Sequence, residues 1–238
     1  ELELNFKHIL SQIQIKVKNG NENLVYNIKA VRINSVVGKK KLNYSTTTNT
    51  STWGKIEGVN SDAQYTLTYA NPYKLDGKNT TELTLTSADA TVENGGGAML
   101  IPQAVTAWNG AKVDDTNQYD GGTYISIYLN VRMASGNKFM YPAGAQGELA
   151  YGWVAIPVPT INWEEGNKYI YTLDMSTGCG KVDPVDPGEN VNPNGKDPSK
   201  PKDPAKGDNV FGKAIKFTVK VLDWTDKFAG TDDGKIEM

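Results

Sequence analysis

The sequence predicts an all-β protein, an antiparallel β-sandwich with few or no helices. Apolar and polar residues alternate with a period of two in several stretches, which is typical of strands that bury one face. The 24 glycines and 11 prolines together fill 35 of the 238 positions, so the chain is rich in turns. No window of a dozen residues shows a helical apolar period with caps. Two sheets that share an apolar interior are the economical solution.

The clearest predicted strand is 123–133. One face carries only apolar residues and the other carries mainly polar ones, so we expect this strand to be half-buried. The apolar residues are Ile125, Ile127, Leu129, Val131 and Met133. The same alternation recurs at 65–69, 169–175 and 215–221, and Asn19-Gly20 and Asp76-Gly77 are among the turn signals between strands.

The N-terminal stretch changes phase. Apolar residues occupy even positions from Leu2 to Leu10 and odd positions from Ile13 to Val17. A one-residue shift moves every later side chain to the opposite face, so a bulge or bend near Ser11 is expected. We expect residues 1–18 to be either the first strand of this domain or a strand shared with a missing N-terminal domain.

Residues 181–211 break the pattern. Six of the eleven prolines and eleven charged residues fall there, so we expect an exposed, semi-stiff loop. Regular alternation resumes in 212–224, which places this loop before the last strand. The predicted organisation is therefore one main β-sandwich domain over 1–238, with 181–211 inserted in it.

The residues of most catalytic and metal sites are scarce. His8 is the single histidine and Cys179 the single cysteine, so we expect neither a disulfide nor a histidine-rich metal site. Acidic pairs such as Asp114-Asp115 are interpreted as solvated turns. The stretch 190–195 resembles a calcium loop but lacks its carboxylates. We therefore predict no enzyme activity, no cofactor and no metal.

Charge and hydropathy exclude other partners. The net charge is −2, and charged residues are spread along the sequence, so no nucleic-acid partner is expected. No run of 18 apolar residues occurs, and no leader pattern is present at Glu1. Five tryptophans could stack on sugar rings, although core packing is the more common role of this side chain.

Five motifs in order resemble those of the fimbrillin-like family, the pilus and adhesin subunits of Bacteroides-type bacteria that are related to type V pilins. The motifs cover most of the chain. They are the segments Leu4–Ile13, Met99–Gln103 followed by Trp108, Trp163–Thr172, Gly180–Pro184 and Gly212–Trp224.

The resemblance implies a transthyretin-like or immunoglobulin-like Greek-key sandwich in an exported lipoprotein of the outer membrane. In that family a protease removes an N-terminal strand, and a strand from the next subunit fills the vacated groove. The chain carries no cysteine at its start that could hold a lipid, so any membrane attachment would depend on an anchor absent from it. It resembles mainly the C-terminal sandwich of the family.

The predicted function is a structural subunit of a bacterial cell-surface pilus or fimbria that assembles with other pilus subunits by β-strand donation. Its expected location is the outer membrane or cell surface. The alternative is a glycan-binding or tip adhesin module, which would contact host or bacterial surface glycans or proteins through residues that the sequence does not identify. The assembly-strand candidates are Leu2, Leu4, Phe6, Ile215, Phe217, Val219 and Val221.

Overall fold

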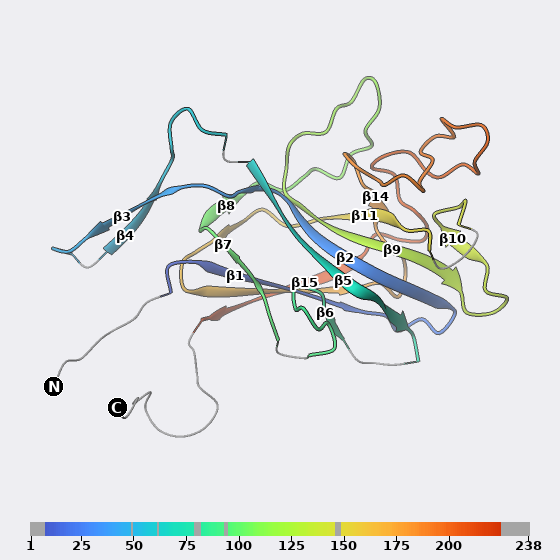
Figure 1. Cartoon of the computed structure of the whole chain (residues 1–238), viewed down its shortest axis with the longest axis horizontal. Helices are drawn as coiled ribbons and strands as arrows, with labels where there is room; N and C mark the ends of the chain where they lie inside the picture. The colour runs from blue at the N-terminus through green and yellow to red at the C-terminus, as the bar shows by residue number, and fades with distance from the viewer. Residues whose placement is uncertain are drawn as a thin grey trace.

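The computed structural model describes residues 8–224 except 49, 61, 79–81, 93–94 and 146–148. The described residues form fifteen strands and no helix. Most strands belong to two large sheets packed face to face, and two small strand pairs lie beside them (Figure 1). The prediction of an all-β sandwich is confirmed.

The first large sheet, here called sheet 1, has one parallel pair at its centre. Its neighbouring strands β1 and β13 run in the same direction, although β1 lies near the N-terminus and β13 in the second half of the chain. All other pairs of sheet 1 are antiparallel. The order is β15 (Lys216–Asp223), β13 (Asn167–Asp174), β1 (Ser11–Lys18) and β6 (Leu83–Thr84), with β7 (Ala98–Leu100) also paired to β1.

The second large sheet, sheet 2, is antiparallel throughout. Its order is β14 (Lys181–Val182), β11 (Gly152–Pro157), β9 (Tyr124–Met133), β2 (Leu24–Val37) and β5 (Asp62–Asp76), with β10 (Phe139–Tyr141) also paired to β9. The small pairs are β8 (Gln103–Val105) with β12 (Ile161–Trp163), and β3 (Lys41–Ser45) with β4 (Thr50–Gly54). The β3–β4 hairpin stands away from the sandwich (Figure 1).

The core lies between the inner faces of the two sheets. Ile13, Ile15 and Val17 of β1 are fully buried, which confirms the odd phase expected for this strand. Ile127 and Leu129 of β9 meet them in the same apolar cluster. Burial of each such side chain contributes about 2 kcal/mol to the free energy of folding. The even-phase residues Leu2 to Phe6 lie outside the described residues.

Strand β2 changes phase twice along its length. Its pairing shifts between Ile28 and Ala30 and again between Ile33 and Val36, and Ser35 in the second irregularity has a φ of 56°. At the first shift β2 has one residue more than β9, and at the second it has one residue more than β5, so the apolar side chains return to the inner face. A long strand thereby follows the twist of the sandwich without exposing its core residues.

Strand β9 differs from the half-buried strand that the sequence predicts. Its outer face carries Tyr124, Ser126 and Asn130, and these are buried as well. Two long excursions, 106–123 and 183–210, lie over the outer side of sheet 2 (Figure 1). Pro187 and Gly188 of the second excursion contact the Trp153 region, where the Trp153 backbone N–H donates to the Pro187 carbonyl at 2.9 Å.

The second excursion corrects the expectation that 181–211 is an exposed loop. Parts of it are exposed, but Val182, Asp183, Val191, Asp203 and Ala205 are buried. Low apolar content led to the prediction of exposure, yet this segment is ordered chiefly by hydrogen bonds to buried carboxylates. Two aspartates act as its anchors.

Asp183 is the first anchor. Its carboxylate accepts hydrogen bonds from the Ser126 hydroxyl at 2.6 Å and the Tyr124 hydroxyl at 3.1 Å, and from the backbone N–H groups of Val185 and Asp186, each at 2.9 Å. Burial raises the pKa of Asp183, and these donors oppose the shift without cancelling it. Asp183 thus joins the start of the excursion to the outer face of β9.

Asp203 is the second anchor. It accepts the backbone N–H groups of Ala143 at 2.8 Å and Asn192 at 2.9 Å. The side-chain amide of Asn192 in turn donates to the backbone carbonyls of Asp197, Lys200 and Pro201, at 2.8, 3.0 and 3.2 Å. Asn192 and Asp203 therefore close the far end of the excursion into a compact loop.

The connection into β15 depends on two glycines that touch. Gly178 and Gly212 form an isolated bridge, and the Lys213 N–H donates to the Thr177 carbonyl at 2.9 Å. Gly212 has a φ of +66°, and a Cβ there would lie 2.1 Å from the Thr177 oxygen. A side chain at Gly212 is therefore excluded by backbone conformation and by lack of space.

Replacement of Asp183 tests the first anchor. Asp183→Ala leaves buried donors without an acceptor, so we expect the free energy of unfolding to fall by about 3 kcal/mol in denaturant titrations. Asp183→Asn keeps an acceptor oxygen and is expected to recover most of the loss. The control is Asp186→Ala, which removes an exposed ion pair with Arg32 and is expected to cost less than about 1 kcal/mol. An equal loss in the Asp186 variant would contradict the anchoring role.

Replacement of Gly212 tests the attachment of β15. We expect Gly212→Ala to accelerate amide hydrogen exchange across 216–223 more than across β9, because the Cβ pushes the entry to β15 away from Thr177. The matched control is Gly121→Ala, since Gly121 has a φ of +80° and a Cβ there meets nothing within 4 Å. Exchange that rises equally in the two variants would show that backbone strain, and not the close approach, is responsible.

Candidate functional site

The predicted C-terminal assembly residues all lie on or next to β15. Ile215 directly precedes the strand, and Phe217, Val219 and Val221 alternate within it. These four side chains therefore share one side of the strand. The other predicted assembly residues, Leu2, Leu4 and Phe6, lie outside the described residues.

The register shows that this apolar row faces the interior of the sandwich. Phe217, Val219 and Val221 of β15 pair with Leu173, Tyr171 and Tyr169 of β13 in turn, so the two rows lie on the same side of sheet 1. The three β13 residues are at most 2% exposed. On β15, however, Phe217 is 37% and Val221 is 48% exposed.

The difference arises because sheet 2 covers β13 but does not fully cover β15. A row of side chains that belongs to the core by its direction is therefore accessible from outside. Ile215 and Val219 still pack against the margin of the core cluster. The row is thus continuous with the interior and not an isolated surface patch.

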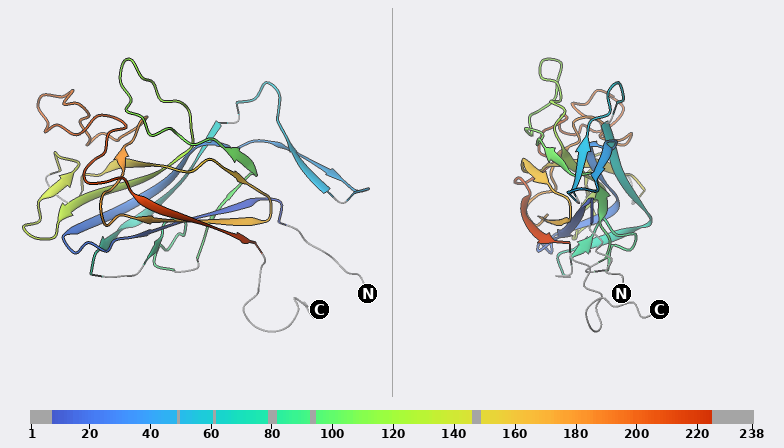
Figure 2. Two further views of the ribbon diagram at one scale, coloured as in Figure 1. Left: turned by 180° about the vertical axis from the view of Figure 1, so that it is seen from behind. Right: turned by 90° about the vertical axis from the view of Figure 1, so that its left-hand side faces the viewer.

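The backbone of β15 is also accessible along one edge. All eight of its residues pair with β13, and no other described strand pairs with its second edge. In the view from behind, β15 (red) runs across the front of the molecule (Figure 2). An edge strand of this length presents a series of unpaired N–H and C=O groups to another chain.

The neighbouring strand β13 provides a rigid base for this edge. The Trp163 indole donates to the Tyr171 hydroxyl at 3.0 Å, and the Tyr169 hydroxyl donates to the Asn162 carbonyl at 2.8 Å. Burial raises the pKa of Tyr171 to about 12, so the hydroxyl stays protonated. At the far end of β15, the Trp224 N–H donates to the Gly166 carbonyl at 2.6 Å.

The single cysteine and the single histidine both make packing contacts. Cys179 is fully buried, and burial raises the pKa of its thiol, which makes it unreactive. His8 stacks on Trp224 with ring centroids 3.9 Å apart. Within the described ranges, no group of three histidine, cysteine or acidic residues is placed to hold a metal ion, and no helix is long and apolar enough to cross a membrane.

The tryptophans contribute mainly to packing. Trp108, Trp153 and Trp163 are buried, and Trp53 and Trp224 are half-buried. Arg32 stacks over Trp153, with 3.6 Å from its guanidinium carbon to the ring centroid, so this ring is occupied within the fold. The hypothesis of an aromatic platform for sugars gains no support from these three rings.

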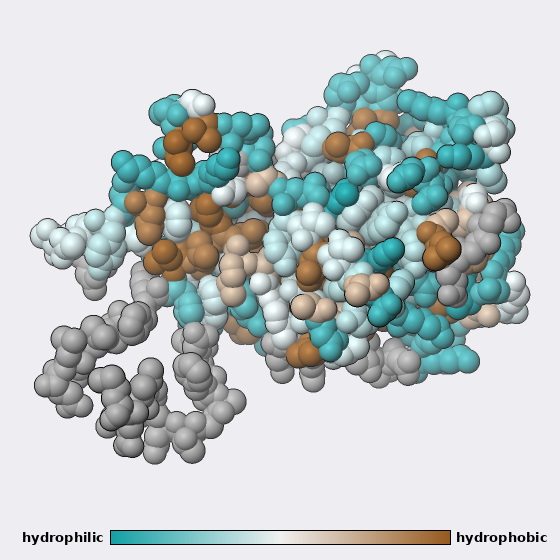
Figure 3. Space-filling model, viewed as in Figure 1, coloured by the Kyte–Doolittle hydropathy of each residue, from teal (hydrophilic) through white to brown (hydrophobic). Residues whose placement is uncertain are grey.

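A second apolar surface lies beside the β3–β4 hairpin (Figure 3). Leu42 of β3 is 38% exposed, and Ile56 and Val59 in the loop after β4 are exposed as well. This surface belongs to strands that do not pair with sheet 1. It is therefore separate from the β15 row.

Two comparisons with known proteins found similar proteins. A family model described as fimbrillin-like matches residues 1–189. Among solved structures, the chain is similar to a fimbrial protein from Bacteroides vulgatus ATCC 8482, with 13% identity and a TM-score of 0.47, over 92% of this chain and 56% of that one. The chain thus spans little more than half the length of that protein. None of the curated proteins matches it.

The matched region contains four of the five motifs that carry the resemblance, and the last, Gly212–Trp224, lies beyond it. The match extends over well more than half of the 238 residues. The resemblance stated from the sequence is confirmed, and the chain belongs to the fimbrillin-like family.

Proposed function

We propose that this protein is a structural subunit of a bacterial cell-surface pilus and that it joins a neighbouring subunit by β-strand complementation at β15. Membership of the fimbrillin-like family implies a place in a cell-surface fimbria and assembly with other subunits. Export to the outer membrane and the absence of a catalytic role are part of the proposal.

One observation carries the assembly mode. The residues of β15 that face the interior are partly exposed, and the same strand has an unpaired backbone edge. An added strand would satisfy the edge N–H and C=O groups and would cover the apolar row at the same time. Hydrogen bonding and burial therefore favour the same partner, an extended segment with alternating apolar residues.

The sequence contains a segment with that alternation. Leu2, Leu4 and Phe6 occupy every second position before β1. We propose the corresponding segment of a neighbouring copy as the donor strand. Its three apolar side chains would match the three of β15 at the same spacing of two residues per repeat.

Charge placed on either face of β15 tests this assignment. Phe217→Asp puts a carboxylate into the apolar row, so we expect association to weaken by about tenfold or more, since burial of a phenylalanine contributes about 2 kcal/mol. Thr218→Asp places the same charge on the opposite face of the same strand and is expected to leave association nearly unchanged. Size-exclusion chromatography with light scattering over a concentration series measures the oligomers.

Thermal melts of the two variants provide the folding control. Phe217 is already 37% exposed, so neither variant is expected to lose the cooperative transition. If the unaltered chain stays monomeric at every concentration, or if the two aspartates weaken association equally, strand complementation at β15 is wrong.

A further inference from the structure

The outer face of sheet 1 concentrates positive charge. The side chains of β1, β13 and β15 that point away from the core are fixed by the register that buries Ile15, Tyr171 and Leu173. Twelve positions form this outer face. They are Gln12, Gln14, Lys16 and Lys18 on β1, Lys168, Ile170, Thr172 and Asp174 on β13, and Lys216, Thr218, Lys220 and Leu222 on β15.

Five of these twelve residues are lysines and one is acidic, although the chain as a whole has a net charge of −2. Asp174 pairs in register with Lys216 on one side and Lys18 on the other, so one carboxylate lies between two ammonium groups. The Lys18 ammonium is 3.9 Å from the Asp174 carboxylate. Lys168 and Lys220 form no ion pair with any described residue.

The charges influence one another across the strands. Burial and then the charge of Lys16 lower the pKa of Lys168. Although burial opposes it, hydrogen bonds from Ser176 and the charges of Lys18 and Lys216 hold the pKa of Asp174 below its ordinary value. The charges of Lys16, Lys18 and Lys216 are smaller causes than burial and the Ser176 hydrogen bonds, and each acts in the direction expected where positive charges are close together.

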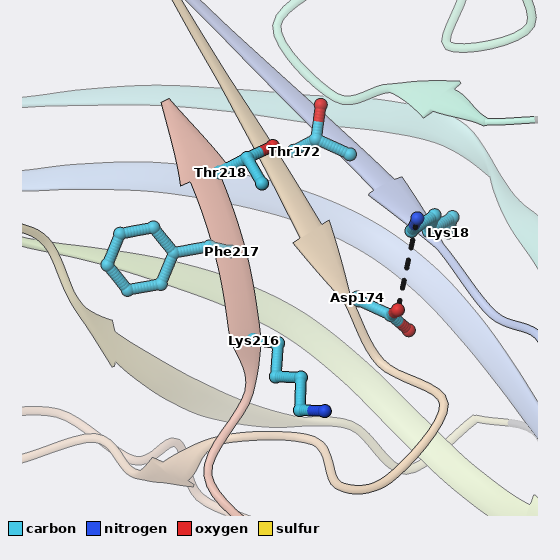
Figure 4. Close-up of a pocket in the computed structure, with 6 residues that line it drawn as sticks. All are labelled: Lys18, Thr172, Asp174, Lys216, Phe217 and Thr218. Carbon is cyan, nitrogen blue, oxygen red and sulfur yellow. Dashed lines mark ion pairs between the residues drawn. The ribbon is translucent and has the colours of Figure 1, made fainter. Parts of the chain in front are cut away.

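The face is open over β15, whereas at β1 Gln14 is buried and Lys16 pairs with Glu82 at 3.7 Å. A hollow lies where β1, β13 and β15 meet, and Lys18, Asp174 and Lys216 line it together with Thr172 and Thr218 (Figure 4). Phe217 also borders the hollow, although its ring points away from Thr218 (Figure 4). Because neighbouring strands lie about 4.8 Å apart, Lys18 and Lys216 are separated by roughly 10 Å at their backbones. Such a surface suits a long ligand better than a small enclosed one.

We propose that this outer face of sheet 1 binds an acidic polysaccharide, a sugar polymer that carries carboxylate or sulfate groups. The lysines would contact the anionic groups. Thr172 and Thr218 lie among the lysines and Gln12 lies beside Lys168, and they supply hydroxyl and amide groups that can hydrogen bond to sugar hydroxyls. The lysines of β15 lie on the opposite side of the strand from its apolar row, so the two proposed surfaces use different side chains.

The side chains favour a sugar polymer over a nucleic acid. None of the twelve outer positions carries an aromatic ring, and stacking on such rings is a main source of affinity for single-stranded nucleic acids. None carries an arginine either, the side chain that pairs with phosphate in two parallel hydrogen bonds. A ligand of this face would therefore be bound by lysine ammonium groups and by the hydroxyl and amide groups beside them.

The test measures binding of fluorescently labelled heparin and polygalacturonate, with neutral dextran and a DNA duplex as comparison probes. The variant is the triple substitution Lys18→Gln, Lys216→Gln and Lys220→Gln. The matched control changes the same charge elsewhere, through Lys39→Gln, Lys196→Gln and Lys202→Gln, all exposed positions outside sheet 1. Binding is followed by fluorescence anisotropy at several salt concentrations.

We expect the sheet 1 triple variant to bind both acidic polysaccharides on the order of tenfold or more weakly, and its residual binding to depend less on salt. The control triple variant is expected to bind like the unaltered chain, and dextran is expected not to bind. Oligomer formation should be unchanged in the sheet 1 variant, because Phe217 and Val221 are intact. If the unaltered chain binds the acidic polysaccharides but does not form oligomers, the proposal for the β15 edge is wrong and the proposal for this site stands.

Three results would overturn the proposal. The first is no binding of either acidic polysaccharide, and the second is an equal loss of binding in the two triple variants. The third is tighter binding of the DNA duplex than of both polysaccharides, which would assign the face to nucleic acid. Thermal melts show whether each variant is folded, so loss of binding through unfolding is recognised directly.

Discussion

The incomplete overlap of the two stacked sheets at β15 is the constraint on which the organisation of this molecule depends. Strands β1 and β13 lie beneath sheet 2, so their inner side chains reach full burial. Strand β15 continues sheet 1 past that cover, with the same alternation and the same direction of its side chains. The apolar residues that face the core therefore continue onto an accessible strand, and β15 combines an exposed apolar row with an unpaired backbone edge.

Period-two alternation was enough to predict the strands around 125–133, 169–175 and 215–221. It could not separate a buried strand from an open one, because Tyr169–Leu173 and Phe217–Val221 have the same pattern and differ only in what lies above them. Cover of this kind is a property of the tertiary structure. The candidate edge could thus be located from the sequence, but its exposure could not.

Residues 183–210 show a second limit of sequence patterns. Proline and charge predicted exposure, since few apolar side chains are available for burial. The structure instead buries Asp183 and Asp203 and surrounds each with donors, most of them backbone N–H groups. The clustering of lysines on one face could not be predicted from the sequence either. Lys18, Lys168 and Lys216 are far apart in the sequence, and only the register of β1, β13 and β15 brings them onto one face.

The parallel pairing of β1 with β13 also affects how the chain must fold. Gln12 takes its place beside Lys168, so the central ladder of sheet 1 joins a strand made early in synthesis to one made late. Contacts this distant along the chain slow folding, and β1 keeps an unpaired edge until β13 is available. Until residues 167–174 are made, this edge of β1 is therefore free to pair with other chains.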